Sequence, residues 1–304
     1  MPGQVALVDL GSNAVRLLLA ELGPGRHIRI LREARAQTRL GGGRSGRLPR
    51  QAIADTLDAV RRFLRVVRNG QPLRVLAIAT SAVRDAGNRD RLLEPLRRRH
   101  GVEVAVLSGC EEARLGALAA LESLRFRAGV VMDLGGGSLQ LTHVRDGLPH
   151  AAVSFPLGVV RTTRRFLRHD PPRRQELTRL RDEIRQQLAA ASPPVEPGST
   201  LVGLGGTVRA LAAIHLSGRH RRERHGLRLS RHDITRIRAR LEALPLRKRR
   251  RVPGLKAERA DIIVAGALIV EELMLSGDYP ALTVCMRGVR DGLLLVAAGR
   301  APVS

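Results

Sequence analysis

The chain has 304 residues, of which 43% are apolar, and it carries a formal charge of +25. Its length exceeds that of most single compact domains, so we expect two domains with ordinary apolar cores. Nearly all of the positive charge is arginine, because Lys248 and Lys256 are the only lysines. Such a charge either attracts a polyanion or reflects arginines spread over solvated surfaces, and composition alone leaves both interpretations open.

The low aromatic and cysteine contents exclude several classes of protein. With no Trp, one Tyr and four Phe, the chain lacks a stacking platform for single strands, which argues against nucleic acid as a partner. Cys110 and Cys285 form neither a disulfide framework nor a zinc site. The apolar stretch 262–274 contains Glu271, which favours a buried helix over a membrane span. Asp9 interrupts the N-terminal apolar run, which has no basic start, so we expect a cytoplasmic protein without a signal peptide.

The first part of the chain shows an α/β pattern that begins with a hairpin. Short apolar runs bounded by turn residues predict strands, and apolar residues at helical spacing predict helices. In chain order we predict strands at 5–8, 15–21 and 27–34, a glycine-rich loop at 38–48, a helix at 53–67, a strand at 73–79, a loop at 79–88, a helix at 89–100, a strand at 102–107 and a helix at 109–124.

The same pattern restarts near residue 126. We predict strands at 130–133, 139–144 and 151–155, then helices, a strand that enters a helix through 205–207, a helix with capping-box spacing at Ser230 and Asp233, a mostly apolar helix at 258–275, a strand at 282–284 and a helix at 289–298. The repeat indicates an internal duplication of architecture. We therefore predict two domains, at 1–125 and 126–304.

Each half opens on an aspartate followed by a glycine turn. The first turn reads Asp9-Leu10-Gly11-Ser12-Asn13, the second Asp133-Leu134-Gly135-Gly136-Gly137-Ser138, and a third, Gly205-Gly206-Thr207, joins a strand to a helix. Glycines let backbone N–H groups point into a shared concavity, and serine hydroxyls add donors, which suits phosphoryl oxygens. The aspartates repel phosphate and are better placed to hold a divalent cation. One such hairpin is ordinary, but the three turns together predict phosphate binding.

Eight motifs, in order along nearly the whole chain, resemble one protein family. They read VDLGSNAVRLL, ATSAVRDAGN, SGCEEARLG, VMDLGGGSLQL, FPLGVVR, VGLGGTVRALA, VPGLKAERADIIVAGALI and RGVRDGLLL. The chain resembles the Ppx/GppA family of exopolyphosphatases and guanosine pentaphosphate phosphohydrolases, in the actin/Hsp70/sugar-kinase superfamily, and looks like its short, two-domain form. The resemblance implies an α/β fold with two ribonuclease-H-like (actin-like ATPase) domains flanking a cleft. A homodimer is a further expectation from the resemblance.

Two adjacent glutamates stand in the motif SGCEEARLG. Ser108 precedes Glu111 by the spacing of a capping box, so Glu111 is expected to bond the Ser108 backbone N–H. Glu112 lies about 100° further around the helix and is left free, although the helix dipole alone also favours a glutamate in the first turn. By resemblance, this second glutamate matches the family's catalytic base. Glu112 is therefore expected to orient and deprotonate the attacking water.

Arginines beside these motifs are candidates for holding phosphate. Arg84 follows a buried strand, at the edge where α/β proteins bind ligands, and it matches a phosphate-contacting arginine of the family. Its guanidinium could clamp a phosphate through two hydrogen bonds. Arg16 reads equally well as a ligand contact and as a solvated side chain. The run 247–251 is interpreted as an exposed basic patch that could also guide a long polyanion.

One position departs from the family's usual Gly-Gly-Gly-Ser-Thr-Glu-Leu pattern. Leu139 and Gln140 replace the Thr-Glu pair, whose glutamate is expected to help hold the metal. The resemblance thus implies Mg²⁺, or Mn²⁺, near Asp9, Asp133 and Gln140. Gln140 keeps an oxygen but loses the charge, so reduced metal affinity or turnover is expected.

Two functions remain open from the sequence. The first is metal-assisted attack of water on the terminal phosphate of inorganic polyphosphate, or of guanosine pentaphosphate, with the positive charge and the lack of aromatics favouring polyphosphate. The second, motivated by Gln140, is a protein that binds these compounds without efficient turnover. A duplex nucleic-acid binder and a sugar-kinase-like or acetate-kinase-like enzyme are the remaining alternatives, from charge and superfamily respectively.

Overall fold

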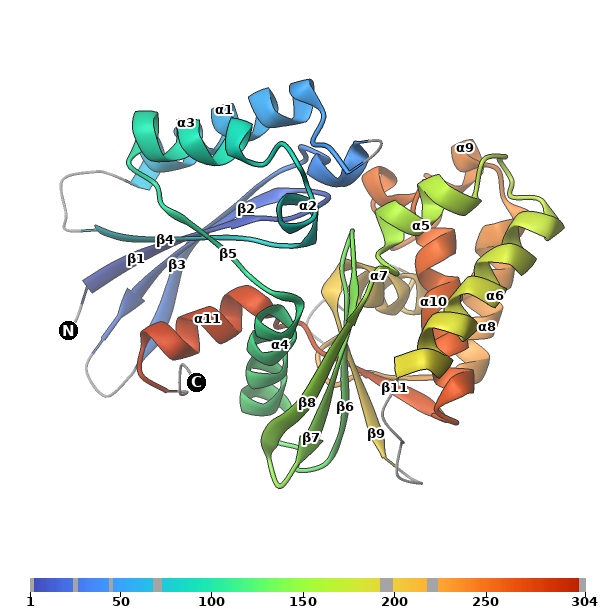
Figure 1. Cartoon of the computed structure of the whole chain (residues 1–304). Coiled ribbons are helices and arrows are strands. Elements are labelled where there is room, and N and C mark those ends of the chain that lie inside the picture. The colour runs from blue at the N-terminus through green and yellow to red at the C-terminus, as the bar shows by residue number, and fades with distance from the viewer. Residues whose placement is uncertain are drawn as a thin grey trace. The chain divides into compact units, whose positions relative to one another are not determined.

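A computed structural model of the chain (Figure 1) describes residues 3–23, 27–43, 46–67, 73–191, 199–217 and 224–300. Residues 44 and 45 of the predicted glycine-rich loop lie outside these ranges. Contacts divide the chain into two compact units: unit 1 is Met1–Glu112 with Arg290–Ser304, and unit 2 is Ala113–Val289. The predicted boundary lies after residue 125, whereas this division falls between Glu112 and Ala113, inside a helix. It also assigns the C-terminal segment to unit 1.

Unit 1 is built on a five-stranded mixed sheet in the order β3-β2-β1-β4-β5. β1 and β2 form an antiparallel hairpin, and β4 and β5 continue the sheet in parallel to β1. The predicted strands are confirmed, as β1 (Gly3–Leu10), β2 (Val15–Leu22), β3 (Ile28–Ala36), β4 (Leu73–Ala79) and β5 (Val104–Val106). Its helices are α1 (Arg50–Val67), α2 (Ser81–Arg84), α3 (Asp90–His100) and α11 (Val289–Ala297), with a 3-10 turn η2 at Leu40–Gly42.

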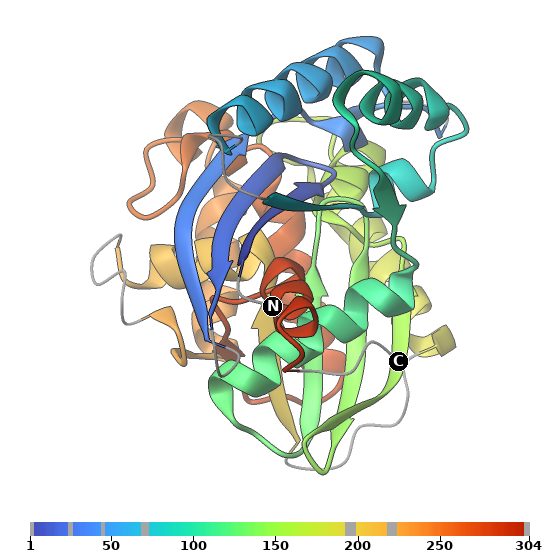
Figure 2. The same ribbon diagram turned by 90° about the vertical axis from the view of Figure 1, so that its left-hand side faces the viewer.

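Alternation along β1 divides its side chains between two helical layers. Ala6 and Val8 belong to the core beneath α1 and α3, whereas Leu7 packs with Leu294 of α11 on the opposite face (Figures 1 and 2). Because successive residues of a strand point to opposite faces, Asp9 lies on the side of α11. The strand pattern therefore decides which helix can reach this aspartate.

Unit 2 repeats this plan on a six-stranded sheet in the order β10-β11-β9-β6-β7-β8. The strands are β6 (Gly129–Leu134), β7 (Leu139–Arg145), β8 (Leu148–Phe155), β9 (Thr200–Leu204), β10 (Arg228–Ser230) and β11 (Ala281–Val284). The helices are α4 (Gly109–Leu124), α5 (Val159–Phe166), α6 (Arg174–Ala191), α7 (Gly205–His215), α8 (Arg231–Ala243), α9 (Leu246–Arg249) and α10 (Ile263–Ser276), with a 3-10 turn η4 at Ala257–Arg259.

Two helical layers also enclose the second sheet. On one face Ala117 of α4 packs with Val131 and Val202 (Figure 2), and on the other Met132 belongs to a large core shared with α7 and α10. Asp133 follows Met132 and therefore lies on the side of α4. Each unit is thus a sheet between helices, with the aspartate of its first strand facing a single helix.

The loop predicted at 79–88 and the start of the helix predicted at 258–275 differ from the structure. The loop predicted at 79–88 contains the short helix α2, because the N–H groups of Val83 and Arg84 both donate to the carbonyl of Thr80 at 3.0 Å. The apolar helix predicted from residue 258 begins only at Ile263. The residues before it form the turn η4, in which the N–H of Ala260 donates to the carbonyl three residues earlier.

The expected buried helix and basic patch are both refined by the structure. α10 is buried from Ile263 to Met274, including Glu271 and Glu272. Within the described ranges, no helix combines the length and apolarity that crossing a membrane requires. The patch predicted at 247–251 is exposed except at Arg249. That side chain is 4% exposed because it pairs with the carboxylate of Asp170.

The connection between α5 and α6 closes around Glu176. Its carboxylate accepts hydrogen bonds from the backbone N–H groups of Arg168 (2.8 Å) and Arg173 (2.9 Å), and it lies 2.9 Å from Nδ1 of His169. Burial by itself raises the pKa of Glu176. The hydrogen bonds from His169 and from the backbone N–H groups outweigh burial and lower this pKa from its ordinary value of 4.5 to about 2. The ionised carboxylate therefore holds the loop that leads from α5 to α6.

We expect Glu176→Gln to destabilise the protein at pH 7 by about 1–3 kcal/mol, because an amide N–H₂ replaces one of the accepting oxygens. The folded-state pKa lies below the ordinary value of 4.5, so the carboxylate stabilises the fold above that pH and loses its effect as the pH falls towards 2. Urea unfolding of both proteins at pH 7 and pH 3 measures the difference. The difference in unfolding free energy should be smaller at pH 3 than at pH 7. An equal difference at both pH values would contradict the stabilising role of the Glu176 carboxylate.

Candidate active site

The first turn places Asp9 between two arginines of unit 1. Asp9 is 8% exposed, and its Oδ2 lies 3.8 Å from Nη1 of Arg16, its partner across the β1–β2 hairpin, and 3.9 Å from Nε of Arg290 at the start of α11. A buried carboxylate needs such compensation. Arg16, which the sequence left open, is therefore a partner of Asp9.

The same turn is held by the segments that follow β3 and β4. Ser12 shares a hydrogen bond of 3.0 Å with Ser81 at the start of α2, and its carbonyl accepts from the N–H of Gly41 at 2.8 Å. Nδ2 of Asn13 is buried and has no hydrogen-bond partner among the residues that the structure describes. The turn therefore offers an amide donor beside a serine that is fixed in place.

Glu112 and Arg84, predicted separately, are brought together in unit 1. Nη1 of Arg84 donates to the Leu107 carbonyl (2.8 Å) and lies 3.3 Å from Oε2 of Glu112, which is 6% exposed. The capping box is also confirmed: the N–H of Glu111 donates to Ser108 Oγ, and the Ser108 N–H donates to the Glu111 carboxylate. The carboxylate of Glu111 is therefore used by the capping box, whereas the carboxylate of Glu112 faces Arg84.

The second turn is built against the N-terminus of α5. The carbonyl of Gly135 accepts from the N–H of Val159 at 3.0 Å, and that of Gly136 from the N–H of Val160 at 2.8 Å. A Cβ on Gly158 would lie 2.2 Å from the backbone of Gly137. Gly158 therefore has a structural reason, because the absence of a Cβ lets the N-terminus of α5 approach the second turn closely.

Asp133 lies where two glycines leave room for its carboxylate. A Cβ on Gly116 of α4 would lie 3.5 Å from Oδ2, and one on Gly205 would lie 3.0 Å from Oδ1. Gly205 also has φ of +90°, a conformation that favours glycine. Asp133 therefore stands beside both the second and the third turn.

The third turn differs from its prediction in what its residues contact. The guanidinium of Arg259 lies over Gly206, where a Cβ would meet Nη2 at 1.9 Å. The side chain of Thr207 is 1% exposed and packs against α10 at Gly266. The assignment of Thr207 to phosphate thus stays a prediction, whereas Arg259 is a cation placed directly on the turn.

Gln140 is buried opposite Asp133 in the β6–β7 hairpin. Its Nε2 donates to Ser138 Oγ at 2.6 Å and to Ser154 Oγ at 3.4 Å. Its Oε1 is buried without a hydrogen-bond partner in the described part of the chain. The Gln140 side chain is therefore held by hydrogen bonds from its nitrogen, and its oxygen remains available as an acceptor.

The candidate metal ligands are the side-chain oxygens of Asp9, Asp133 and Gln140. The described residues contain no group of three acidic, histidine or cysteine side chains that could hold a metal. Mg²⁺ is often held by only one or two carboxylates together with substrate phosphates. Asp133 and the unpartnered oxygen of Gln140, which lie opposite each other in the β6–β7 hairpin, fit that mode, and Asp9 offers a carboxylate in unit 1.

Four arginines near the turns were missed by the sequence reasoning. Nε of Arg161 donates to the carbonyl of Gly137 at 2.8 Å, and Nε of Arg209 donates to that of Gly205 at 3.1 Å. Arg259 and Arg290 are the other two. All four stand inside the motifs of the family resemblance, but in a chain with so many arginines nothing in the sequence separates them from the rest.

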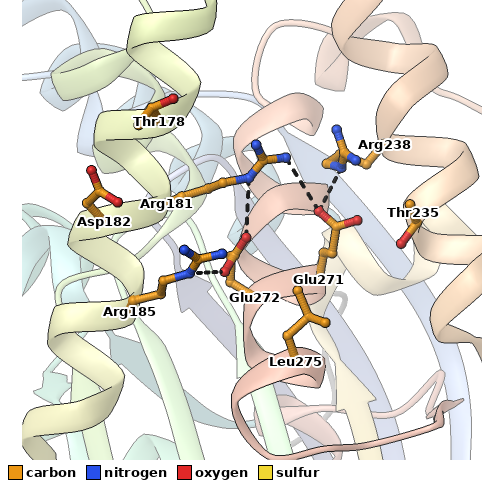
Figure 3. Close-up of a pocket in the computed structure, with 9 residues that line it drawn as sticks. All are labelled: Thr178, Arg181, Asp182, Arg185, Thr235, Arg238, Glu271, Glu272 and Leu275. Carbon is orange, nitrogen blue, oxygen red and sulfur yellow. Dashed lines mark hydrogen bonds and ion pairs between the residues drawn. The ribbon is translucent and has the colours of Figure 1, made fainter.

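A charged cavity of about 510 Å³ between α6, α8 and α10 shares no residue with the turns (Figure 3). Glu272 pairs with Arg181 (3.3 Å) and Arg185 (2.8 Å) of α6, and Glu271 pairs with Arg238 of α8 (2.7 Å). Three arginines in its lining face two glutamates and one aspartate. The charges of these side chains balance, so the lining forms a network of ion pairs between helices. It offers no net electrostatic attraction to a phosphate chain.

The two sheets and their aspartate–glycine turns define the actin-like class of α/β proteins, and comparison with known proteins gives the family. The model of the Ppx/GppA phosphatase family matches residues 20–301. The chain therefore belongs to this family, and it is a phosphoanhydride hydrolase. The predicted fold class is confirmed.

Relatives match over nearly the whole chain. Exopolyphosphatase 1 of Mycobacterium leprae is 32% identical over 96% of this chain and 88% of its own, and exopolyphosphatase 2 of Mycobacterium tuberculosis is 32% identical over 97% and 99%. The crystal structure of the Aquifex aeolicus member of the Ppx/GppA family has a TM-score of 0.84 at 29% identity and covers 100% of both chains. The similarity thus extends through both units.

We expect Gly158→Ala to displace α5 from the second turn, because the new Cβ would overlap backbone atoms rather than a flexible side chain. Overpacking of this kind costs about 1–3 kcal/mol of unfolding free energy. Gly3→Ala is the matched control, since its Cβ would meet nothing within 4 Å. Urea unfolding compares the two variants, and equal stabilities would contradict the close approach.

Proposed function

We propose that the protein is an exopolyphosphatase that releases the terminal phosphate of inorganic polyphosphate by attack of water. The observation that carries this proposal is the pair of Glu112 and Arg84, a buried carboxylate held by a guanidinium. A fixed carboxylate can take a proton from water, and a fixed guanidinium can stabilise phosphoryl oxygens. The exopolyphosphatases among the relatives support the choice of substrate.

In the proposed reaction, the oxygen of water attacks the terminal phosphorus and the bond from that phosphorus to the bridging oxygen breaks. The products are inorganic phosphate and a polyphosphate shorter by one unit. A carboxylate oxygen of Glu112 accepts the proton of the water, and Arg84 keeps that carboxylate oriented. Mg²⁺ or Mn²⁺, when bound, neutralises charge on the phosphoryl oxygens.

The turns hold the phosphates in this proposal. Backbone N–H groups and Ser12, Asn13 and Ser138 donate to phosphoryl oxygens, and arginines on the turns balance the charge. Arg161 suits this role because it bonds the carbonyl of Gly137, and Arg259 because its guanidinium lies over Gly206. Asp9 in unit 1, and Asp133 and Gln140 in unit 2, are the candidate ligands of the metal.

A second candidate is binding of polyphosphate or guanosine pentaphosphate without efficient turnover. It is favoured by the neutral Gln140 at a position where the family usually carries a carboxylate. Guanosine pentaphosphate is also the alternative substrate, since its terminal phosphate offers the same chemistry. Polyphosphate is the first choice, because the positive surface charge suits a long polyanion and the chain has few aromatic residues for a base.

We expect Glu112→Gln to lower kcat for polyphosphate by about 10²–10⁴-fold with little change in KM, because the amide cannot accept the proton. Glu111→Gln is the matched control: it alters the capping box and should cost about 1 kcal/mol of stability or less while it leaves kcat near that of the natural protein. Phosphate release is measured with Mg²⁺ and with Mn²⁺.

The same assay with guanosine pentaphosphate separates the two substrates. Equal losses of kcat in Glu111→Gln and Glu112→Gln would contradict the assignment of the base. No phosphate release from either compound, with either metal, would contradict the proposed hydrolase activity and leave the binding protein as the better account.

A further inference from the structure

The hydrogen bond between Gln140 and Ser138 has a defined direction. Nε2 of Gln140 lies 2.6 Å from Ser138 Oγ, and the two side chains are 1% and 3% exposed. An amide nitrogen can only donate, so the serine oxygen is the acceptor in this bond. The Ser138 hydroxyl therefore keeps its own hydrogen for another acceptor.

Among the described residues, the bond from Gln140 is the single hydrogen bond of Ser138 Oγ. The hydroxyl hydrogen of Ser138 therefore has no acceptor in that part of the chain. The serine of the first turn is different, because Ser12 and Ser81 are both hydroxyls and either can be the donor. A buried donor without an acceptor is costly unless a ligand supplies one. In a turn of glycine backbone, a phosphoryl oxygen is the ligand atom that fits.

We propose that Gln140 is a positioning residue that fixes the Ser138 hydroxyl as a donor to a phosphoryl oxygen of the substrate. The inference rests on the proposed function, because it assigns the second turn to substrate phosphate. Gln140 need not touch the substrate for this role. It acts through the polarity of one hydroxyl.

A carboxylate at residue 140 would act in the opposite direction. It can only accept, so it would take the Ser138 hydrogen for itself. It would also place a second negative charge directly across the hairpin from Asp133. The glutamine therefore leaves the turn with one more donor and one less charge, which favours binding of phosphate without help from a metal.

The test is a double-mutant cycle on Ser138→Ala and Gln140→Glu, with inorganic tripolyphosphate as the probe and calorimetry in the presence of EDTA. We expect Ser138→Ala to weaken binding roughly tenfold or more, the usual effect of a lost hydrogen bond to a charged group. Gln140→Glu should weaken binding at least as much. Its effect should be smaller in the Ser138→Ala background, because the hydroxyl is then absent.

Two further variants serve as controls. Ser154→Ala removes only the 3.4 Å contact of Nε2, so binding should stay within about twofold of the natural protein. Gln140→Met keeps the volume but cannot orient the hydroxyl, and it tests the inference should the buried carboxylate of Gln140→Glu prevent folding. It should weaken binding less than Ser138→Ala does. Thermal unfolding verifies that each variant is folded.

Unchanged or tighter tripolyphosphate binding in Gln140→Glu overturns the inference, and so do fully additive effects in the cycle. If residue 140 acted only as a metal ligand, Gln140→Glu would instead lower the Mg²⁺ concentration that supports half-maximal phosphate release and leave the affinity in EDTA unchanged. Binding without hydrolysis would contradict the proposed function alone, because calorimetry needs no turnover. Absence of tripolyphosphate binding in the natural protein overturns both.

Discussion

A carboxylate at the end of the first strand of each sheet sets the main requirement of this structure. An uncompensated charge at such a position is costly, so the residues around each aspartate must accommodate it. Asp9 has the guanidiniums of Arg16 and Arg290, and the second of these is available only because α11 returns from the far end of the chain to the first sheet. Asp133 packs against Gly116 and Gly205, where a Cβ would meet its carboxylate. The return of α11 and the glycines at 116 and 205 thus supply the surroundings of these carboxylates.

Arginine has a more specific role here than the total charge suggests. The sequence offered two interpretations, a field for a polyanion and solvated side chains. Arg161 and Arg259 instead lie on the glycine backbones of two turns, and Arg249 is buried against Asp170. Under the proposed function, a guanidinium held at a turn, as Arg161 is by the carbonyl of Gly137, would need little reorganisation on binding phosphate, which is the condition for effective electrostatic stabilisation.

Local patterns were predictable from the sequence and distant contacts were not. The strand Leu73–Ala79 and the capping boxes at Ser108 and Ser230 agree with the structure, because a few neighbouring residues determine them. Glu112 and Arg84 were both predicted, but their pairing depends on how β5 and α4 follow α2. Arg290 was missed because its partner lies at the opposite end of the chain. The packing of Thr207 on Gly266 is likewise set by α10, which no local pattern around Thr207 reveals.

The central claim is that the aspartate–glycine turns are where phosphate binds. Hydrogen exchange of backbone amides, with and without tripolyphosphate and Mg²⁺, measures this directly, because bound phosphate protects the N–H groups that it contacts. The account predicts slower exchange in 9–16, 133–140 and 205–209. Protection confined to α6, α8 and α10 around the charged cavity, with the three turns unchanged, would contradict it.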